Sequence, residues 1–314
     1  MCMDKTDRKL LALLLEDSRT PITILAKNLH VSREVTQYRL ERLVRTGVIK
    51  SFFADINLTR MGYIGAAFFL IVKSTQYHEL KSYVESSPFV SWAAEWSGNY
   101  SIGMTIIGKT IQELDDRVKL ILKKFSNSII SHIFILHRKN TFFYEKHFNE
   151  KTFHKEKKRI VNYSIDKIDF KLLKSLSINS RENTVTLANN VKLSAVAVAK
   201  RIKKLEEAGY IEKYSIFIDI TKLKYYQYSI FIDNKELQDL GLLKSYLATH
   251  KSVNFIAEYI GEQFFEFGIF VKEPYELKSI LLEIEKKFPD YVFTRIALLQ
   301  KEFVSTGPPR CVFE

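Results

Sequence analysis

The chain has 314 residues, of which 46% are hydrophobic and 27% are charged, and its formal net charge is +12. This length suits two to four domains, and the apolar fraction, with only six prolines, excludes a disordered chain. The positive charge is concentrated, because residues 4–50 and 164–213 each hold ten basic and six acidic residues, whereas residues 214–314 hold 12 basic and 14 acidic ones. Charge on two short segments favours nucleic acid over a uniform anionic surface such as a membrane.

Several other classes of protein are disfavoured. The first 20 residues are charged throughout, unlike a signal peptide, and the apolar run Ile64–Val72 is much shorter than the roughly 20 residues that span a membrane. We therefore expect a cytoplasmic, nucleoid-associated protein with no membrane partner. Cys2 and Cys311 offer neither a disulfide framework nor zinc-ligand spacing. Since no Gly-rich phosphate loop, nucleophile elbow or HExxH motif occurs, we expect no catalytic residues, no metal, no cofactor and no enzymatic activity.

Residues 4–55 are predicted to form a helix-turn-helix domain. The third helix begins after Ser32, a side chain suited to capping, and ends at Gly47, while Thr23 could cap the second helix. A helix, a short helix and a tight turn before a third helix are typical of this motif. The predicted elements are helices over Asp4–Asp17, Ile24–Leu29 and Ser32–Gly47, a turn at His30-Val31, and a strand over Val48–Ala54 in the place of a wing.

Residues 62–144 are predicted to form a second domain of alternating strands and helices. Their order is β-α-β-β-α-β, which is the ferredoxin-like arrangement. The strands are expected over Ala66–Lys73, Val90–Trp96, Tyr100–Gly108 and Ile129–Thr141, and the helices over Tyr77–Ser86 and Ile111–Phe125. The fold class is therefore α+β.

The whole arrangement occurs twice. Shifting the chain by 162 residues aligns Ser32 with Ser194, Arg39 with Arg201 and Gly47 with Gly209. This predicts a second helix-turn-helix domain over 164–217, a second ferredoxin-like domain over 224–306, and a basic linker over 145–163. The second set of elements is expected over Ile165–Leu176, Thr186–Asn190, Ser194–Ala208, Tyr226–Asp233, Leu237–His250, Val253–Ile260, Phe264–Val271, Pro274–Phe288 and Tyr291–Val304.

These motifs resemble the Lrp/AsnC family of prokaryotic transcription regulators. The stretch DRKLLALLLEDSR matches the family's first helix, L-x-x-S-x6-R-L-x-x-L-x-x-x-G-V-I over Leu29–Ile49 matches its recognition helix, and INLTRMGY over Ile56–Tyr63 matches the connector to the sensor domain. The resemblance implies two winged helix-turn-helix domains, each followed by a ferredoxin-like sensor domain. It also implies a sequence-specific regulator that binds double-stranded DNA.

The tandem copy suggests how the chain assembles. Family members are normally single units that dimerise and associate further through their sensor sheets. Two fused units would form that dimer within one chain, because the linker raises the effective concentration of the second unit. We expect self-association through the sensor sheets inside the chain, and we favour a homodimer of chains over a monomer, with a larger assembly left open.

The two recognition helices are predicted to differ. Early residues of such a helix face base edges, and basic residues elsewhere hold phosphates. Where the first copy has Arg33, Glu34 and Gln37, the second has only alanine and valine, so we expect the first helix to supply specificity and the second to supply phosphate affinity. Arg39 and Arg201 are expected to contact phosphates, unless they pair with acidic residues such as Glu16 or Glu182. The predicted DNA-binding residues are Ser32, Arg33, Glu34, Gln37, Tyr38, Arg39, Arg42, Ser194, Lys200, Arg201, Lys203 and Lys204.

The sequence argues against an amino-acid effector. The resemblance implies a Gly-x-x-Asp turn in each sensor domain, but Ser101 and Phe264 replace the aspartate. A carboxylate is the natural partner of an ammonium group, so its loss in both copies argues against such a ligand. The candidate effector-binding residues are Glu95, Gly98, Ser101, Glu258, Gly261 and Glu262.

Two alternatives stay open at this stage. The two-domain unit also resembles that of sirohaem decarboxylases. That resemblance implies that His and Arg residues of the sensor sheet serve the chemistry. Here Val90–Trp96 and Val253–Ile260 contain neither residue type. The second alternative is a nucleoid-organising protein of low sequence specificity, which the apolar second recognition helix would suit.

Overall fold

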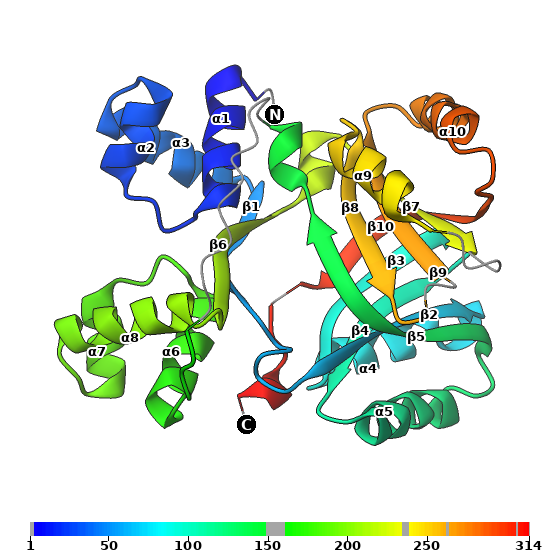
Figure 1. The fold of residues 1–314 in the computed structure, drawn as a ribbon, viewed down its shortest axis with the longest axis horizontal. Helices are drawn as coiled ribbons and strands as arrows, with labels where there is room; N and C mark the ends of the chain where they lie inside the picture. The colour runs from blue at the N-terminus through cyan, green and yellow to red at the C-terminus, as the bar shows by residue number, and fades with distance from the viewer. Residues whose placement is uncertain (1–2, 149–160, 234–238, 262–263, 306, 314) are drawn as a thin grey trace. The chain divides into compact units, whose positions relative to one another are not determined.

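A computed structural model of the chain describes residues 3–148, 161–233, 239–261, 264–305 and 307–313 (Figure 1). The chain divides into two compact units. The head unit comprises residues 1–62, 148–223 and 306–314, and the sensor unit comprises residues 63–147 and 224–305. Each unit therefore takes one part from each copy of the repeat. Most of the predicted linker, residues 149–160, lies outside the described residues.

The head unit contains both helix-turn-helix domains. The first consists of α1 (Lys5–Glu16), α2 (Ile22–Leu29) and α3 (Arg33–Arg45), followed by β1 (Ile49–Ile56). The second consists of α6 (Lys167–Ile178), α7 (Thr184–Val191) and α8 (Ala195–Glu207), followed by β6 (Ile211–Ile218). Two short 3-10 helices, η3 (Ile220–Leu223) and η4 (Arg310–Val312), complete the unit in the described part of the chain.

Local signals explain most of these boundaries. Ser32 and Ser194 cap α3 and α8, as predicted, and each hydroxyl accepts from a backbone N–H 3.2 Å away. The tight turn at His30 is also confirmed, because this residue has a left-handed φ of 57°. The prediction that Thr23 caps α2 was wrong. The helix begins two residues earlier than expected, after Pro21, whose carbonyl accepts the first hydrogen bonds of the helix.

The strand predicted in the place of a wing is present, and its partner is the equivalent strand of the other copy. β1 and β6 pair antiparallel, with Phe53 opposite Ser215. These two residues are 162 positions apart, so equivalent positions face each other and a pseudo-twofold axis passes between them. Ala54 and Ile56 of β1 also belong to a buried cluster built mainly on the second domain's helices. The first copy of the repeat therefore contributes to the core of the second domain.

The sensor unit contains both ferredoxin-like motifs. The first consists of β2 (Ile64–Val72), η1 (Ser74–Gln76), α4 (Tyr77–Ser86), β3 (Val90–Gly98), β4 (Ile102–Gly108), α5 (Ile111–Lys124), β5 (Ile129–Phe142) and η2 (Tyr144–His147). The second consists of β7 (Tyr226–Asp233), α9 (Gly241–Thr249), β8 (Val253–Tyr259), β9 (Phe264–Val271), α10 (Glu276–Lys287) and β10 (Phe293–Val304). The α+β class predicted from the sequence is confirmed.

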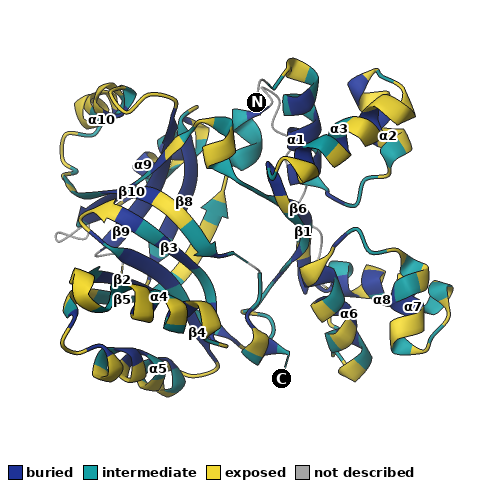
Figure 2. Ribbon diagram, turned by 180° about the vertical axis from the view of Figure 1, so that it is seen from behind, coloured by how far each residue is buried: buried dark blue, intermediate teal, exposed yellow. Residues whose placement is uncertain are grey.

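The two sensor sheets join edge to edge into one closed sheet. The strand order is β10-β3-β4-β2-β5-β8-β9-β7, and β7 pairs again with β10. The last strand of each motif, β5 or β10, pairs with the second strand of the other motif. Figure 2 shows that the strands are mostly buried or intermediate, whereas α5 and α10 carry many exposed residues. Within the described residues, no helix is long and apolar enough to cross a membrane.

Candidate nucleic-acid interface

The recognition helix α3 exposes the residues predicted to read bases. Arg33, Glu34 and Gln37 are all exposed, and Tyr38 is 58% exposed. Backbone and Ser32 hydrogen bonds at the helix N-terminus lower the pKa of Glu34, so this carboxylate is ionised at neutral pH. Gln37 donates to Glu41 one turn along the helix, at 2.6 Å. The front of α3 is therefore a polar surface that combines donors and acceptors, which base-edge contacts require.

Arg39 and Arg42 lie behind this front, and both contact the first helix. One nitrogen of Arg39 donates to Asp4 and Asp7, each at 2.8 Å, and Arg42 donates to the other oxygen of Asp7 at 2.6 Å. The Asp7 side chain is 1% exposed. The hydrogen bonds that Arg39 donates, first to Asp4 and then to Asp7, raise the pKa of its guanidinium. The cluster holds α3 against the start of α1.

The second head repeats this cluster with one difference. Arg201 donates to Asp166 and Asp169 at 2.8 and 2.9 Å. In the place of the second arginine stands Lys204, and the Tyr163 hydroxyl donates to Asp169 instead, at 2.8 Å. Lys204 lies 5.7 Å from the centre of the Tyr163 ring and remains exposed. Arg39 and Arg201 thus both have acidic partners in their own domains, and their contact with phosphates stays a prediction.

Sequence reasoning missed these partners. It considered Glu16 and Glu182, but the acids that pair with the arginines are Asp4, Asp7 and their equivalents in the second copy. The available signal was the recurrence of both aspartates at the same 162-residue offset as the two arginines.

The front of α8 differs from that of α3 in chemistry. Val196 stands where the first copy has Glu34, and it is 67% exposed. Ala199 and Lys200 are also exposed, whereas Ala195, at the position of Arg33, is half-buried and packs against the core of the second domain. Lys203 and Lys204 add positive charge on the same helix, with Lys203 only 3.7 Å from Glu207. The helix offers ammonium groups for phosphates and methyl groups for the bases.

The predicted effector residues are engaged within the sensor unit. Glu95 accepts from Lys81 at 3.0 Å, and its equivalent Glu258 accepts from Lys244 at 2.9 Å. Ser101 accepts from the backbone N–H of Val72 at 3.1 Å. Their role in effector binding stays a prediction.

The two glycines of the effector turns both have positive φ, 107° at Gly98 and 90° at Gly261. A Cβ on Gly98 would lie 2.5 Å from the Ile296 carbonyl oxygen of β10, whereas a Cβ on Gly261 would meet nothing within 4 Å. Strand β10 therefore leaves no space for a side chain at Gly98, whereas the turn at Gly261 has that space. Glu262, the remaining candidate, lies outside the described residues.

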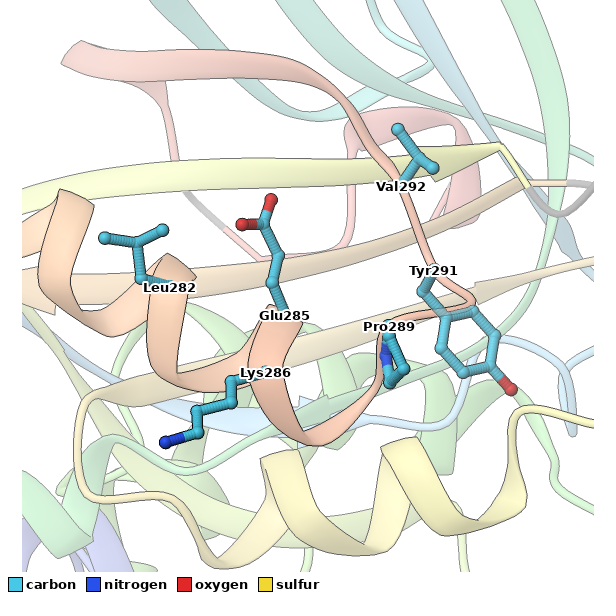
Figure 3. Close-up of a pocket in the computed structure, with 6 residues that line it drawn as sticks. All are labelled: Leu282, Glu285, Lys286, Pro289, Tyr291 and Val292. Atoms are coloured by element: carbon cyan, nitrogen blue, oxygen red, sulfur yellow. The ribbon is translucent and has the colours of Figure 1, made fainter.

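Other candidate sites in the described ranges are few. No group of three His, Cys, Asp or Glu residues there is arranged to hold a metal ion. A surface depression of about 450 Å³ lies at the end of α10 (Figure 3). It is lined by Leu282, Glu285, Lys286, Pro289, Tyr291 and Val292. Its lining is mostly apolar and belongs to the sensor unit, so it is a site distinct from the two recognition helices.

Comparisons with known proteins agree with this geometry. The AsnC-type helix-turn-helix domain matches residues 3–44 and 165–206. The chain is 35% identical over 114 residues to the regulatory protein AsnC of Haemophilus influenzae, covering 36% of this chain and 76% of that protein. It is 30% identical over 120 residues to the transcriptional regulator FL11 of Pyrococcus furiosus, covering 38% of this chain and 80% of that protein.

A solved structure resembles the chain over nearly its whole length. The siroheme decarboxylase NirDL in complex with an iron-uroporphyrin III analogue gives a TM-score of 0.66 at 15% identity, covering 97% of this chain and 93% of that one. At this identity the likeness concerns the fold alone. The AsnC-type match, in contrast, falls on both helix-turn-helix domains. The chain belongs to the Lrp/AsnC family and is a DNA-binding regulator with two AsnC-type helix-turn-helix domains.

Proposed function

We propose that the chain is a sequence-specific transcription regulator in which one polypeptide supplies two unequal reading heads. In this proposal residues 4–55 and 164–217 are the heads, and residues 62–144 and 224–306 are the sensor domains. The β1–β6 pairing around a pseudo-twofold axis supports the view that the heads act as one pair. Such a pair suits two half-sites related by approximate twofold symmetry.

The difference between the exposed fronts of α3 and α8 carries this proposal. Arg33 can donate two hydrogen bonds to guanine, Gln37 can pair with adenine, and Glu34 can accept from cytosine. In the second head, Val196 and the alanines beside it cannot form hydrogen bonds with bases. The lysines of α8 still attract phosphates, so this head adds affinity that depends little on sequence.

The proposal is tested by fluorescence anisotropy with two duplexes, the promoter of the protein's own gene and a scrambled version, over a salt series. We expect the wild type to prefer its promoter. The variant Arg33→Ala/Gln37→Ala should lose that preference, because each good base contact contributes about 1–3 kcal/mol of discrimination. A change in the other head, Lys200→Ala, should weaken both duplexes alike and reduce the salt slope by about one phosphate contact.

Other results would favour a nucleoid-organising protein, or would argue against DNA binding altogether. Equal affinity of the wild type for the two duplexes would favour a protein of low specificity. A loss of preference in the Lys200→Ala variant alone would reverse the assignment of the heads. Failure to bind either duplex at moderate salt would remove DNA from the proposal and direct attention to the sensor unit.

The fold likeness to NirDL supports a second candidate, an enzyme acting on a tetrapyrrole. An iron-uroporphyrin carries several carboxylates, which need basic partners. Inside the closed sheet of this chain, Glu266 is buried and accepts from Tyr259 at 2.5 Å, and Arg295 is bound by both oxygens of Asp233. These residues do not favour a polycarboxylate. Titration with iron-uroporphyrin III, followed by absorption spectroscopy, tests this candidate. A saturable shift of its main absorption band would support the enzyme.

A further inference from the structure

A buried seam joins the two heads at the pseudo-twofold axis. Ser18 and Ser180 are equivalent residues of the two copies, both are fully buried, and their hydroxyl oxygens lie 2.7 Å apart. The backbone N–H of Ser18 donates to the Tyr214 carbonyl of β6 at 3.1 Å, and that of Ser180 donates to the Phe52 carbonyl of β1 at 3.0 Å. The end of each first helix is therefore tied to the strand of the other copy.

Two arginines extend this seam in a reciprocal exchange. Arg19 donates to the backbone carbonyls of Ser180 and Glu182. Arg181 donates to the carbonyls of Ser18, at 2.5 Å, and Thr20, at 3.2 Å. Each guanidinium thus bonds to the turn that follows the first helix of the opposite head.

The same guanidiniums stack on aromatic rings of the central strands. Arg19 lies 5.3 Å from the centre of the Tyr214 ring, and Arg181 lies 5.7 Å from that of Phe52. Both rings belong to the copy opposite the arginine. Every contact of one arginine thus has its counterpart on the other, which is the pattern of an isologous interface.

This arrangement also brings the positive charges of Arg19 and Arg181 close together. Burial and the nearby charge of Arg19 lower the pKa of Arg181, so two like charges oppose each other at the axis. Repulsion of this kind would separate the heads if nothing balanced it. The balance comes from the four carbonyl acceptors, because charge-assisted hydrogen bonds are stronger than neutral ones, and from the negative charge of Asp17, which acts on Arg181 in the opposite direction to Arg19.

The central strands alone would hold the heads less firmly. β1 and β6 form a two-stranded sheet, and such ribbons vary more in twist than larger sheets do. A change in twist would rotate one recognition helix relative to the other. The seam adds a second set of fixed points, away from the ribbon's own hydrogen bonds.

We propose that Arg19 and Arg181 are positioning residues that set the relative orientation of α3 and α8 without touching DNA. They act by bonding to the turns that follow α1 and α6. The pair of heads then presents one fixed separation to its half-sites. The part of this inference that concerns DNA rests on the function proposed above, whereas the part that concerns head orientation does not.

Distances between the recognition helices test the orientation directly. Nitroxide labels are placed at the equivalent exposed positions, with Glu41→Cys and Lys203→Cys in a chain carrying Cys2→Ser and Cys311→Ser. Double electron–electron resonance should give one narrow distance distribution. In Arg19→Met/Arg181→Met, which keeps the alkyl stems but not the donors, the distribution should broaden or shift. Arg19→Lys/Arg181→Lys should restore part of the narrowness, and Arg45→Met, at an exposed arginine outside the seam, should change nothing.

The DNA measurement separates this inference from the proposed function. With the own-promoter duplex, the double Met variant should bind roughly tenfold more weakly, because a loose second head has a lower effective concentration. Its salt slope should stay unchanged, because the same phosphates are contacted. If the double variant does not fold, Arg181→Met alone is measured. Unchanged distance distributions in the Met variants would overturn the inference. A broadened distribution with unchanged affinity would support the seam and overturn the two-head mode of binding.

Discussion

At the scale of single residues, Arg39 has two candidate tasks that predict different results. As a phosphate contact, its loss would reduce the salt slope of DNA binding. Because it bridges Asp4 and the buried Asp7, we expect Arg39→Ala to lower the free energy of unfolding by about 2 kcal/mol, and a reduced salt slope in the same variant would show the phosphate contact as well. Arg33→Ala, at an exposed arginine of the same helix, should do the opposite: no loss of stability and weaker promoter binding. Denaturant unfolding and the salt series measure both quantities.

Glu266 gives a prediction about pH. Burial raises the pKa of this carboxyl from 4.5 to about 7, although the Tyr259 hydroxyl donates to it. The folded state therefore holds the proton more tightly than the unfolded state, and stability falls as pH rises from about 4.5 to about 7. Glu266→Gln removes this loss, so its advantage should be absent below pH 4.5 and reach about 3 kcal/mol above pH 7. Denaturant unfolding at a series of pH values measures the difference.

A carboxylate on the adjacent strand provides the control for this prediction. Glu258 accepts from Lys244, so Glu258→Gln should remove a favourable contact and should not stabilise the chain at any of these pH values. An advantage of Glu266→Gln that stays constant from pH 4.5 to pH 8 would contradict the titration and indicate a packing effect.

At the scale of elements, the fronts of α3 and α8 should be interchangeable. Both lie on capped helices of the same length with buried faces of their own. We expect the variant Ala195→Arg/Val196→Glu/Ala199→Gln/Lys200→Tyr to unfold within about 1 kcal/mol of the wild type, because three of the four positions are exposed and the half-buried Ala195 lies at the start of the helix. Selection from a random duplex library should then yield an inverted repeat of the first head's half-site. Recovery of the wild-type motif from this variant would show that α8 does not read bases.

The same elements show how far the sequence could be read. Helix caps and turns were predictable because Ser32, His30 and Gly47 act on their immediate neighbours. The start of α2 was misplaced because Thr23 and Pro21 both offer a helix start, and only the structure shows which one the backbone uses. The partners of β1 and of the ends of the sensor sheets depend on contacts more than 100 residues apart, which period and composition do not encode. The chemistry of the exposed residues on α3 and α8 could be predicted from the sequence, but the aspartate partners of Arg39 and Arg201 could not.

At the scale of the whole molecule, one chain should occupy one operator. The strands that would pair between subunits in a dimer pair here within the chain, β1 with β6, β5 with β8 and β10 with β3. We expect light scattering at saturation to give one chain of 36.7 kDa per promoter duplex. Two chains per duplex would contradict this prediction. An apparent affinity for DNA that rises with protein concentration would contradict it as well.

The pairing of Phe53 with Ser215 affects which substitutions these two positions can accept. In a dimer of identical subunits, a residue on the twofold axis must face its own copy, so every mutation there appears twice and must suit itself. Here the two positions are encoded separately, and a large ring faces a small hydroxyl that instead donates to the Leu15 carbonyl at 2.9 Å. Phe53 stacks on Phe217, whose own counterpart is Asp55. A chain that carries both copies can therefore hold complementary pairs that no homodimer could encode.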